Sequence, residues 1–235
     1  MDIELFYTDH GPKEDPSPLV LLHGNGGNSS AFFYVVNHFT PLRRVITVDT
    51  RGHGRSPKGT APFTLDQFSE DLREFLDKMG LKKLTLIGYS DGGNIAMIFA
   101  LKYPEYLSGM VLNGANMFPA GLKKNDLAWI KRTYRKANKR LARHPDDGNA
   151  RDTADLMRLM TAEPNIQPEM LGVIKCPVLV LVGSDDVIRP EHSILIADSF
   201  PHGTLNVIKG GHGIVKTNSS DYNAAVEKFL YDNGI

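Results

Sequence analysis

The chain has one cysteine among its 235 residues, Cys176, so no disulfide can form within it. Its first ten residues, MDIELFYTDH, lack the basic and then apolar segments of a signal peptide, and together these features predict a cytoplasmic protein. An excess of one charge is also missing, because 27 Lys and Arg balance 27 Asp and Glu. No overall field therefore favours nucleic acid or an anionic membrane surface. Apolar runs such as 178–182 are far shorter than the roughly 20 residues that span a bilayer. We therefore expect neither a nucleic-acid nor a membrane partner.

Short apolar runs alternate with amphipathic segments along most of the chain. Six runs have the branched residues and the flanking Gly, Pro, Asn or Asp of β-strands: 19–22, 45–48, 84–87, 110–112, 178–182 and 205–208. Apolar residues at helical spacing follow a capping box at Thr64 and predict a helix over 65–79, and the segments 94–103 and 221–231 have the same pattern. The alternation predicts an α/β fold: a mostly parallel central sheet, buried on both faces, with helices on each side.

The segment 117–172 breaks this alternation because it contains no convincing strand pattern. Apolar stripes predict two helices in it, the first with Leu127, Ile130, Tyr134, Ala137 and Leu141, and the second with Ala154, Met157 and Met160. We therefore divide the chain into a core, 1–116 and 173–235, and a helical insertion, 117–172. Seven Lys and Arg between 131 and 143 form either a solvated outer surface or a docking site for an anionic partner.

A serine lies between two glycines where the strand at 84–87 ends, in the stretch LIGYSDGGN. The pattern G-x-S-x-G between a strand and a helix is typical of a nucleophile elbow, a sharp turn that presents the serine hydroxyl. Bulkier neighbours would collide with the adjacent strand and helix, so Gly88 and Gly92 provide clearance. The start of the following helix would also aim unpaired N–H groups and a partial positive charge at the site. Ser90 is therefore the candidate nucleophile.

A serine hydroxyl is a weak nucleophile near neutral pH and needs a base, which in turn needs an orienting carboxylate. Asp185 and Asp186 follow the strand at 178–182, and His212 follows the strand at 205–208. We expect these side chains at the carboxyl edge of the sheet, and the order Ser, Asp, His matches this elbow architecture. Surface or capping roles are expected for five other histidines: His10, His38, His144, His192 and His202.

A glycine-rich loop, in LLHGNGGNSS, follows the strand at 19–22. The backbone N–H of Asn25 in this loop could join that of Asp91 in an oxyanion hole, with His23 supporting the loop. The same loop approximates the dinucleotide-binding pattern G-x-G-x-x-G, with Asp49 about 20 residues further on. That interpretation, an oxidoreductase, leaves the serine and histidine motifs without a task. No HExxH pattern or cluster of His and carboxylate ligands appears, so we expect no metal and no cofactor.

Taken in order, five motifs resemble those of the α/β-hydrolase family: HGNGG, DTRGHGRS, GYSDGG, GSDDVIRP and GGHG. The likeness covers nearly the whole chain apart from the insertion. It implies an eight-stranded, mostly parallel sheet, with Ser90 as nucleophile and His212 as base. The family's G-x-x-D pattern falls on Asp186, so the resemblance favours Asp186 over Asp185, and it implies a structural role for the loop at 49–55.

Members of this family carry a helical lid at the place of the insertion, which implies that its apolar stripe lines a substrate pocket. Candidate substrate-binding residues are Trp129, Met157, Met160 and Asp91. The stretch from GYSDGG to VLNGAN is similar to the biphenyl-hydrolase-like (valacyclovir hydrolase) branch, which favours esters of α-amino acids. A carboxylate at position 91 would attract an ammonium group, or it only complements the positive helix end. Both interpretations stay open.

The expected activity is hydrolysis of a small carboxylic ester through an acyl-enzyme, without a cofactor. The fold also supports cleavage of other acyl bonds, including α-amino acid esters, thioesters, lactones and carbon–carbon bonds next to a ketone. A protein of a different class, a hydrolase-like ligand receptor with little or no turnover, is the remaining alternative.

Overall fold

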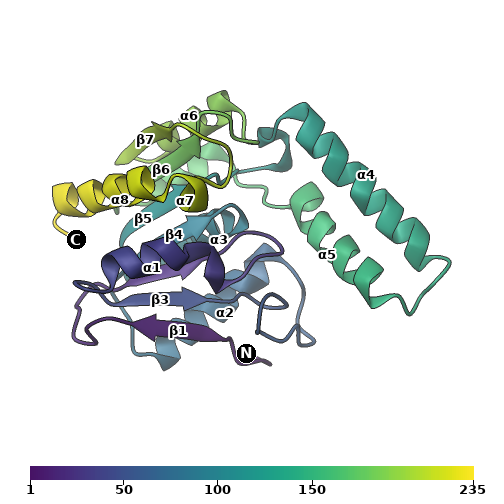
Figure 1. Cartoon of the computed structure of the whole chain (residues 1–235), viewed down its shortest axis with the longest axis horizontal. Helices are drawn as coiled ribbons and strands as arrows, with labels where there is room; N and C mark the ends of the chain where they lie inside the picture. Colours follow the sequence, from purple (N-terminus) through teal and green to yellow (C-terminus); the bar gives the residue numbers. More distant parts are fainter.

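A computed structural model describes all 235 residues, which form one seven-stranded sheet with helices on both sides (Figure 1). The strands are β1 (Tyr7–His10), β2 (Leu19–Leu22), β3 (Val45–Val48), β4 (Leu84–Tyr89), β5 (Leu107–Asn113), β6 (Val178–Gly183) and β7 (Gly203–Ile208). Their order in the sheet is β1-β3-β2-β4-β5-β6-β7. All six predicted strands are confirmed, and each pair among them is parallel.

The two edge strands differ from the expectation. β1 pairs antiparallel with β3, and its sequence YTDH has no apolar run because none of its residues is buried. The six residues before β1 form no strand, so the sheet has seven strands and not the eight that the resemblance implies. At the other edge, β7 is not buried on both faces, since Val207 is 56% exposed. A strand with only one neighbour cannot be covered like a central one.

The α-helices are α1 (Phe33–Phe39), α2 (Leu65–Lys78), α3 (Asp91–Lys102), α4 (Lys124–Leu141), α5 (Gly148–Ala162), α6 (Pro190–Ser199), α7 (Ile214–Thr217) and α8 (Ser219–Asn233). Short 3-10 helices span Ser29–Phe32, Pro104–Tyr106, Pro119–Gly121 and Pro168–Val173. Buried apolar residues of α2, α3 and α6 pack on one face of the sheet, and those of α1, α7 and α8 pack on the other. The core therefore has three layers, as the alternation predicts.

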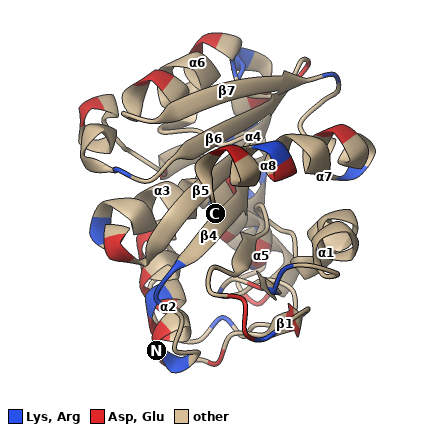
Figure 2. Cartoon of the chain, turned by 90° about the vertical axis from the view of Figure 1, so that its left-hand side faces the viewer, with Lys and Arg blue, Asp and Glu red and all other residues tan.

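Charged residues are absent from six of the seven strands (Figure 2). Strands β2 to β7 contain no Lys, Arg, Asp or Glu, whereas helices such as α2 and α8 carry both signs. This separation follows from burial of the central parallel strands on both faces, where an unpaired charge would be costly. The chain has no helix with the length and apolarity needed to cross a membrane.

Helices α4 and α5 lie within the segment 117–172 and extend away from the sheet as a pair (Figure 1). They pack along each other, and a small buried cluster of Leu122, Ile130 and Ile188 joins the pair to the core. The seven Lys and Arg between 131 and 143 are all exposed. Only Arg140 among them forms an ion pair, with Asp147 at the start of α5.

Candidate active site

Ser90 occupies the single residue between β4 and α3. Its φ of 55° makes it the only non-glycine residue in the chain with a positive φ. Such a conformation costs on the order of 1–3 kcal/mol and persists only where the surroundings impose it. A Cβ on Gly88 would lie 2.3 Å from the carbonyl oxygen of Gly92, and one on Gly92 would lie 2.0 Å from that of Leu22. The flanking glycines are therefore required for the turn.

The α3 helix begins three residues earlier than predicted, at Asp91. Glycines 92 and 93, which weaken a helix in isolation, are accommodated because tertiary packing fixes this end of α3. The early start places the first N–H groups of α3 directly after Ser90.

His212 joins Ser90 to Asp186 in one hydrogen-bonded chain. The Ser90 Oγ lies 3.0 Å from His212 Nε2, and His212 Nδ1 lies 2.7 Å from Asp186 Oδ1. Burial opposes ionisation of Asp186, but the hydrogen bond from His212, the attraction of that ring in its protonated form and the N–H groups of Ile188 and Gly183 together lower its pKa below the ordinary value. An ionised carboxylate only accepts hydrogen bonds, so Nδ1 donates to it, and Nε2 is left to accept from the serine hydroxyl.

The two adjacent aspartates after β6 have opposite environments. Asp186 is 2% exposed and accepts the N–H groups of Ile188 at 3.0 Å and Gly183 at 3.3 Å. The side chain of Asp185 is 91% exposed and pairs with Lys123 at 3.3 Å. Only Asp186 therefore lies beside His212.

The oxyanion-hole candidates lie where neighbouring strands send their connections to opposite faces of the sheet. β2 leads into α1 on one face, and β4, which lies beside it, leads into α3 on the other. Such a crevice is the usual ligand site of an open α/β sheet. The backbone N–H groups of Asn25 and Asp91 donate to no group of the chain, so both are free to bind an oxyanion.

His23 supports the loop that carries Asn25, as expected. Its Nε2 accepts the Thr50 N–H at 3.1 Å, and its Nδ1 lies 2.8 Å from the Gly24 carbonyl oxygen. Burial lowers the pKa of His23 to about 4, so the ring is neutral near pH 7 and can donate from Nδ1 while it accepts at Nε2. His23 is therefore a structural group and not a second base.

The loop that begins at Asp49 backs the glycine-rich loop. One oxygen of Asp49 accepts the Ser29 N–H at 2.7 Å, and the other accepts the Arg55 N–H at 2.9 Å. A Cβ on Gly54 would lie 2.1 Å from Asp49 Oδ2, so the loop is closely packed. Asp49 is 2% exposed and does not line the pocket described below, so its carboxylate is not available for the ribose contact that the dinucleotide interpretation requires.

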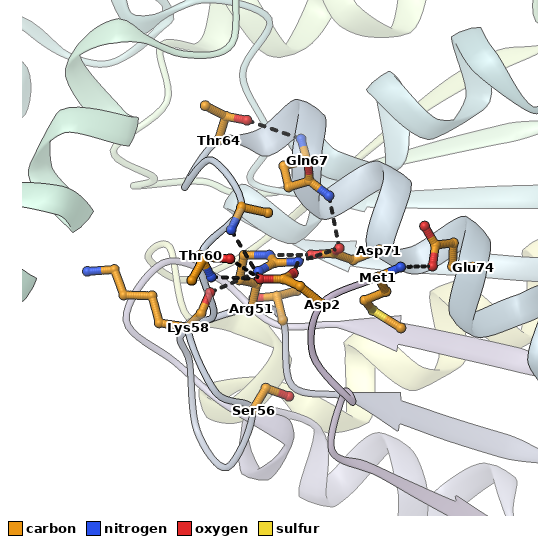
Figure 3. A network of polar contacts seen from close by, with 12 residues as sticks. Met1, Asp2, Arg51, Ser56, Lys58, Thr60, Thr64, Gln67, Asp71 and Glu74 are labelled. Atoms are coloured by element: carbon orange, nitrogen blue, oxygen red, sulfur yellow. Dashed lines mark hydrogen bonds and ion pairs between the residues drawn. The ribbon is translucent and has the colours of Figure 1, made fainter.

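Arg51 anchors the same loop to α2 and to the N-terminal segment (Figure 3). Its guanidinium is fully buried and donates to Asp71 at 2.6 and 2.8 Å and to Asp2 at 2.6 Å. Gln67, in the first turn of α2, donates to Asp71 at 3.0 Å, so the predicted capping box is only half formed; Thr64 accepts the Gln67 N–H, and Glu163 accepts the Leu65 N–H at 2.8 Å. The loop has the structural role that the resemblance implies.

Ser90, His212, Asn25 and Asp91 line a pocket of about 680 Å³. This volume lies within the usual range for small-molecule sites. The predicted lid residues Trp129, Met157 and Met160 all line it. Of the first apolar stripe only Ile130 does so, and Leu127 packs on the cluster of Leu122, Ile130 and Ile188.

Several pocket residues were not anticipated from the sequence: Tyr89, Asn116, Leu122, Leu156, Val187, Ile188 and Lys216. Tyr89 directly precedes Ser90, and Lys216 follows His212 by four residues. This closeness in sequence to the proposed catalytic residues could have identified both as pocket residues. The Tyr89 ring lies 5.2 Å from that of His212. Leu122, Val187 and Ile188 become neighbours only because the insertion folds back on the loop after β6, which no periodicity in the sequence reveals.

Asp91 is 7% exposed, lines the pocket and forms no ion pair. Its Oδ2 accepts from Asn25 Nδ2 at 2.8 Å and its Oδ1 from Asn94 Nδ2 at 3.1 Å. Burial raises the pKa of Asp91, and these two amide donors oppose the rise only in part. The pocket therefore contains a carboxyl group whose hydrogen-bond donors are neutral side-chain amides.

The expectation of a surface or capping role for His192 is wrong. This residue is 1% exposed within α6, and its Nε2 accepts the Met117 N–H at 3.0 Å. Burial and the nearby Arg189 charge lower its pKa to about 4. Its spacing of four residues from the buried Ile196 places both on one helix face, which was the overlooked signal.

Comparison with known proteins agrees with this fold. A family model described as alpha/beta hydrolase fold matches residues 17–169. The "Putative carbamate hydrolase RutD" of Caulobacter sp. (strain K31) is 30% identical over 96% of this chain and 95% of that relative. The human "Serine hydrolase BPHL" is 30% identical over 97% of this chain and 83% of that relative.

Solved structures give the same fold. A thermophilic esterase from Thermogutta terrifontis superposes with a TM-score of 0.81 at 25% identity, covering 98% of this chain and 94% of that one. A protein from a study of carboxylesterases of Nitrososphaera gargenis also gives 0.81 at 25% identity, covering 99% and 96% of the two chains.

Proposed function

The chain belongs to the α/β-hydrolase family, and we propose that it is a serine hydrolase that cleaves small carboxylic esters through an acyl-enzyme. The observation that carries this proposal is the chain of hydrogen bonds from Ser90 through His212 to Asp186, at the wall of a 680 Å³ pocket. The likeness to an esterase over nearly the whole fold supports it. The hydrolase activity of the family supplies the reaction type.

Acylation begins when His212 Nε2 takes the proton of the Ser90 hydroxyl as the oxygen attacks the ester carbonyl carbon. The negative charge that forms on the carbonyl oxygen is received by the N–H groups of Asn25 and Asp91, each typically worth about 2.7 to 4 kcal/mol to the transition state. Asp186 stabilises the imidazolium and holds the ring in the productive tautomer. The carbon–oxygen bond then breaks, and Nε2 gives its proton to the leaving alcohol.

Deacylation repeats these steps with water. His212 Nε2 takes a proton from water, the hydroxide attacks the acyl carbonyl carbon, and the bond to Ser90 Oγ breaks. The proton on Nε2 returns to the serine, and the carboxylic acid leaves. The strained turn at Ser90 keeps its oxygen exposed to the pocket throughout, because regular strand or helix geometry would turn it into the backbone.

One observation favours a second substrate class, esters whose acyl group carries an ammonium. Asp91 is a pocket carboxyl group without a cationic partner, held by the side-chain amides of Asn25 and Asn94. An ammonium group bound next to it would supply the missing charge, whereas an anionic acyl chain would be repelled. A panel of esters with neutral, anionic and amino-bearing acyl groups compares the two classes. A preference for amino-bearing esters that survives Asp91→Asn would contradict this assignment of Asp91.

The main proposal is tested by replacing the nucleophile. Ser90→Ala should lower kcat for p-nitrophenyl butyrate by about 10⁴-fold or more, because the residual rate then comes only from binding and the oxyanion hole. Binding of the hydrolysis product by the variant should be unchanged. Tight ligand binding with negligible turnover in the unmodified protein would instead favour a hydrolase-like receptor.

A further inference from the structure

The side chains of the two proposed oxyanion-hole residues are bonded to each other. Asn25 Nδ2 donates one hydrogen to Asp91 Oδ2 at 2.8 Å and the other to the carbonyl oxygen of Leu156 at 3.2 Å. Leu156 lies in α5, within the insertion. A single amide group thus connects the loop after β2, the first residue of α3 and the lid helix.

The network continues to the other end of the insertion. Asp91 Oδ1 accepts from Asn94 Nδ2 at 3.1 Å, and the same amide nitrogen donates to Asn116 Oδ1 at 3.2 Å. The Asn116 N–H in turn donates to Asn94 Oδ1 at 2.8 Å. Asn94 is 1% exposed and Asn116 7%, and Asn116 is the last residue before the segment 117–172. The buried network therefore contacts the insertion at its base and at α5.

We propose that this network, Asn25–Asp91–Asn94–Asn116, couples the position of the lid helix α5 to the geometry of the oxyanion hole. The inference rests on the proposed function. The side chains of Asn25 and Asp91 are positioning groups, which act through the backbone N–H groups of the same residues. When α5 lies in its place, Leu156 and Asp91 together hold the Asn25 amide, and the loop N–H is fixed where the oxyanion forms.

The loop needs such an anchor because of its composition. Asn25 is flanked by Gly24, Gly26 and Gly27, and Gly26 has a φ of 65°. Glycine-rich backbone has little stiffness of its own, so the Asn25 side chain adds a tie at the loop's centre to those that His23 and Asp49 provide on either side. A displacement of about 1 Å at a reacting group can cost 10²-fold in rate, which gives the tie a measurable effect on turnover.

The network also accounts for a carboxylate at position 91. Each Asp91 oxygen accepts an amide N–H, one from Asn25 and one from Asn94, and only an acceptor on both sides satisfies both donors. An asparagine has nearly the same shape but would direct its own NH₂ group at one of these donors. Asp91→Asn therefore breaks one link while it preserves the size of the side chain.

The test uses the full chain and compares Asn25→Ala, Asn25→Asp and Asp91→Asn with Asn125→Ala, an exposed residue of α4 whose side chain forms no hydrogen bond. We expect Asn25→Ala to lower kcat for p-nitrophenyl acetate by about 10 to 100-fold, below the 10² to 10³-fold loss of a whole oxyanion donor. KM should change by no more than about twofold. A boronic acid that binds Ser90 as a tetrahedral analogue should lose affinity in parallel with kcat, and Asn125→Ala should match the unmodified protein.

A second readout separates coupling from simple loss of structure. Since coupling between two sites is reciprocal, the boronic acid should slow hydrogen exchange of the α5 amides at 148–162 in the unmodified protein, and Asn25→Ala should abolish this protection. Unchanged kcat in Asn25→Ala, or α5 protection that persists in it, would overturn the inference. If the unmodified protein neither hydrolyses the ester nor binds the boronic acid, the proposed function itself fails. The two failures are therefore distinguishable.

Discussion

At the scale of single residues, two neighbouring aspartates provide a sharp test of the site. Asp186→Asn should lower kcat by about 10⁴-fold, because an amide at that position favours the wrong tautomer of His212. Asp185→Asn is the matched control, since that side chain is 91% exposed and its one ion pair is with Lys123. Ester hydrolysis by both purified variants is the measurement. Equal losses, or a larger loss in Asp185→Asn, would contradict the assignment of Asp186.

The residue identities at the site were more predictable than their contacts. Ser90 and His212 could be named from the sequence because each follows an apolar strand, and parallel strands bring their carboxyl ends to one edge. Because both Asp185 and Asp186 follow β6, the residues alone did not identify which of them is the catalytic acid. The family's G-x-x-D pattern favoured Asp186. The bond between the side chains of Asn25 and Asp91 could not be predicted, since it joins two turns 66 residues apart in the chain.

At the scale of elements, the buried Arg51 group joins the loop behind the site to α2. Arg51→Met should lower the free energy of unfolding by about 3–5 kcal/mol, because it leaves the 1%-exposed Asp71 without its charge partner. Arg73→Met, which breaks a partly exposed ion pair with Asp77 on the same helix, should cost no more than about 1 kcal/mol. Urea unfolding of the two variants compares the values. Similar losses would mean that the Arg51 network adds little to stability.

The elements themselves were well predicted where periodicity was strong. The parallel strands and the helices α2, α3, α4, α5 and α8 follow from short apolar runs and from apolar stripes. β1 was missed because a short, partly exposed edge strand leaves no apolar signal, and α3 began early because tertiary contacts overrode the low helix propensity of glycine. The packing of α4 and α5 over the pocket depends on contacts between distant segments, which local patterns do not encode.

At the scale of the whole molecule, zero net charge conceals a separation of charge. The segment 124–143 holds eight Lys and Arg and one acidic residue, a net charge of +7, so the remainder carries −7. The Lys and Arg side chains of the segment 124–143 are exposed. We therefore expect a cation exchanger to retain the protein at pH 7 and low salt, despite a pI of about 7.1. Replacing Arg132, Arg135, Lys136 and Lys139 by Glu should abolish retention. Retention that persists in this variant would assign the binding to another surface.

Stability should also fall in acid because burial lowers the pKa of three histidines, His23, His53 and His192, in the folded protein. Burial lowers the pKa of His23 and His192 to about 4 from the ordinary 6.5, so between these values the unfolded chain binds protons that the folded chain does not. The free energy of unfolding is therefore fully retained above about pH 6.5 and decreases as the pH falls toward 4. His23 and His192 should each account for about 2 kcal/mol of the loss between pH 7 and pH 5.

This dependence is checked by urea unfolding at pH 7 and pH 5. His192→Gln keeps an acceptor for the Met117 N–H but does not titrate, so the loss between the two pH values should be smaller by about 2 kcal/mol than in the unmodified protein. His202→Gln, at an exposed position, is the control and should leave the loss unchanged. An unaltered loss in His192→Gln would show that other groups cause the acid sensitivity.

The whole account depends on one reactive hydroxyl, and its most direct test is covalent labelling. The protein is treated with a fluorophosphonate, residual hydrolysis of p-nitrophenyl butyrate is followed, and the adduct is located by peptide mass spectrometry. We predict one adduct per chain, on Ser90, with activity lost in proportion to labelling. Undiminished ester hydrolysis by fully labelled protein, or an adduct on any other residue that accompanies the loss of activity, would contradict the account.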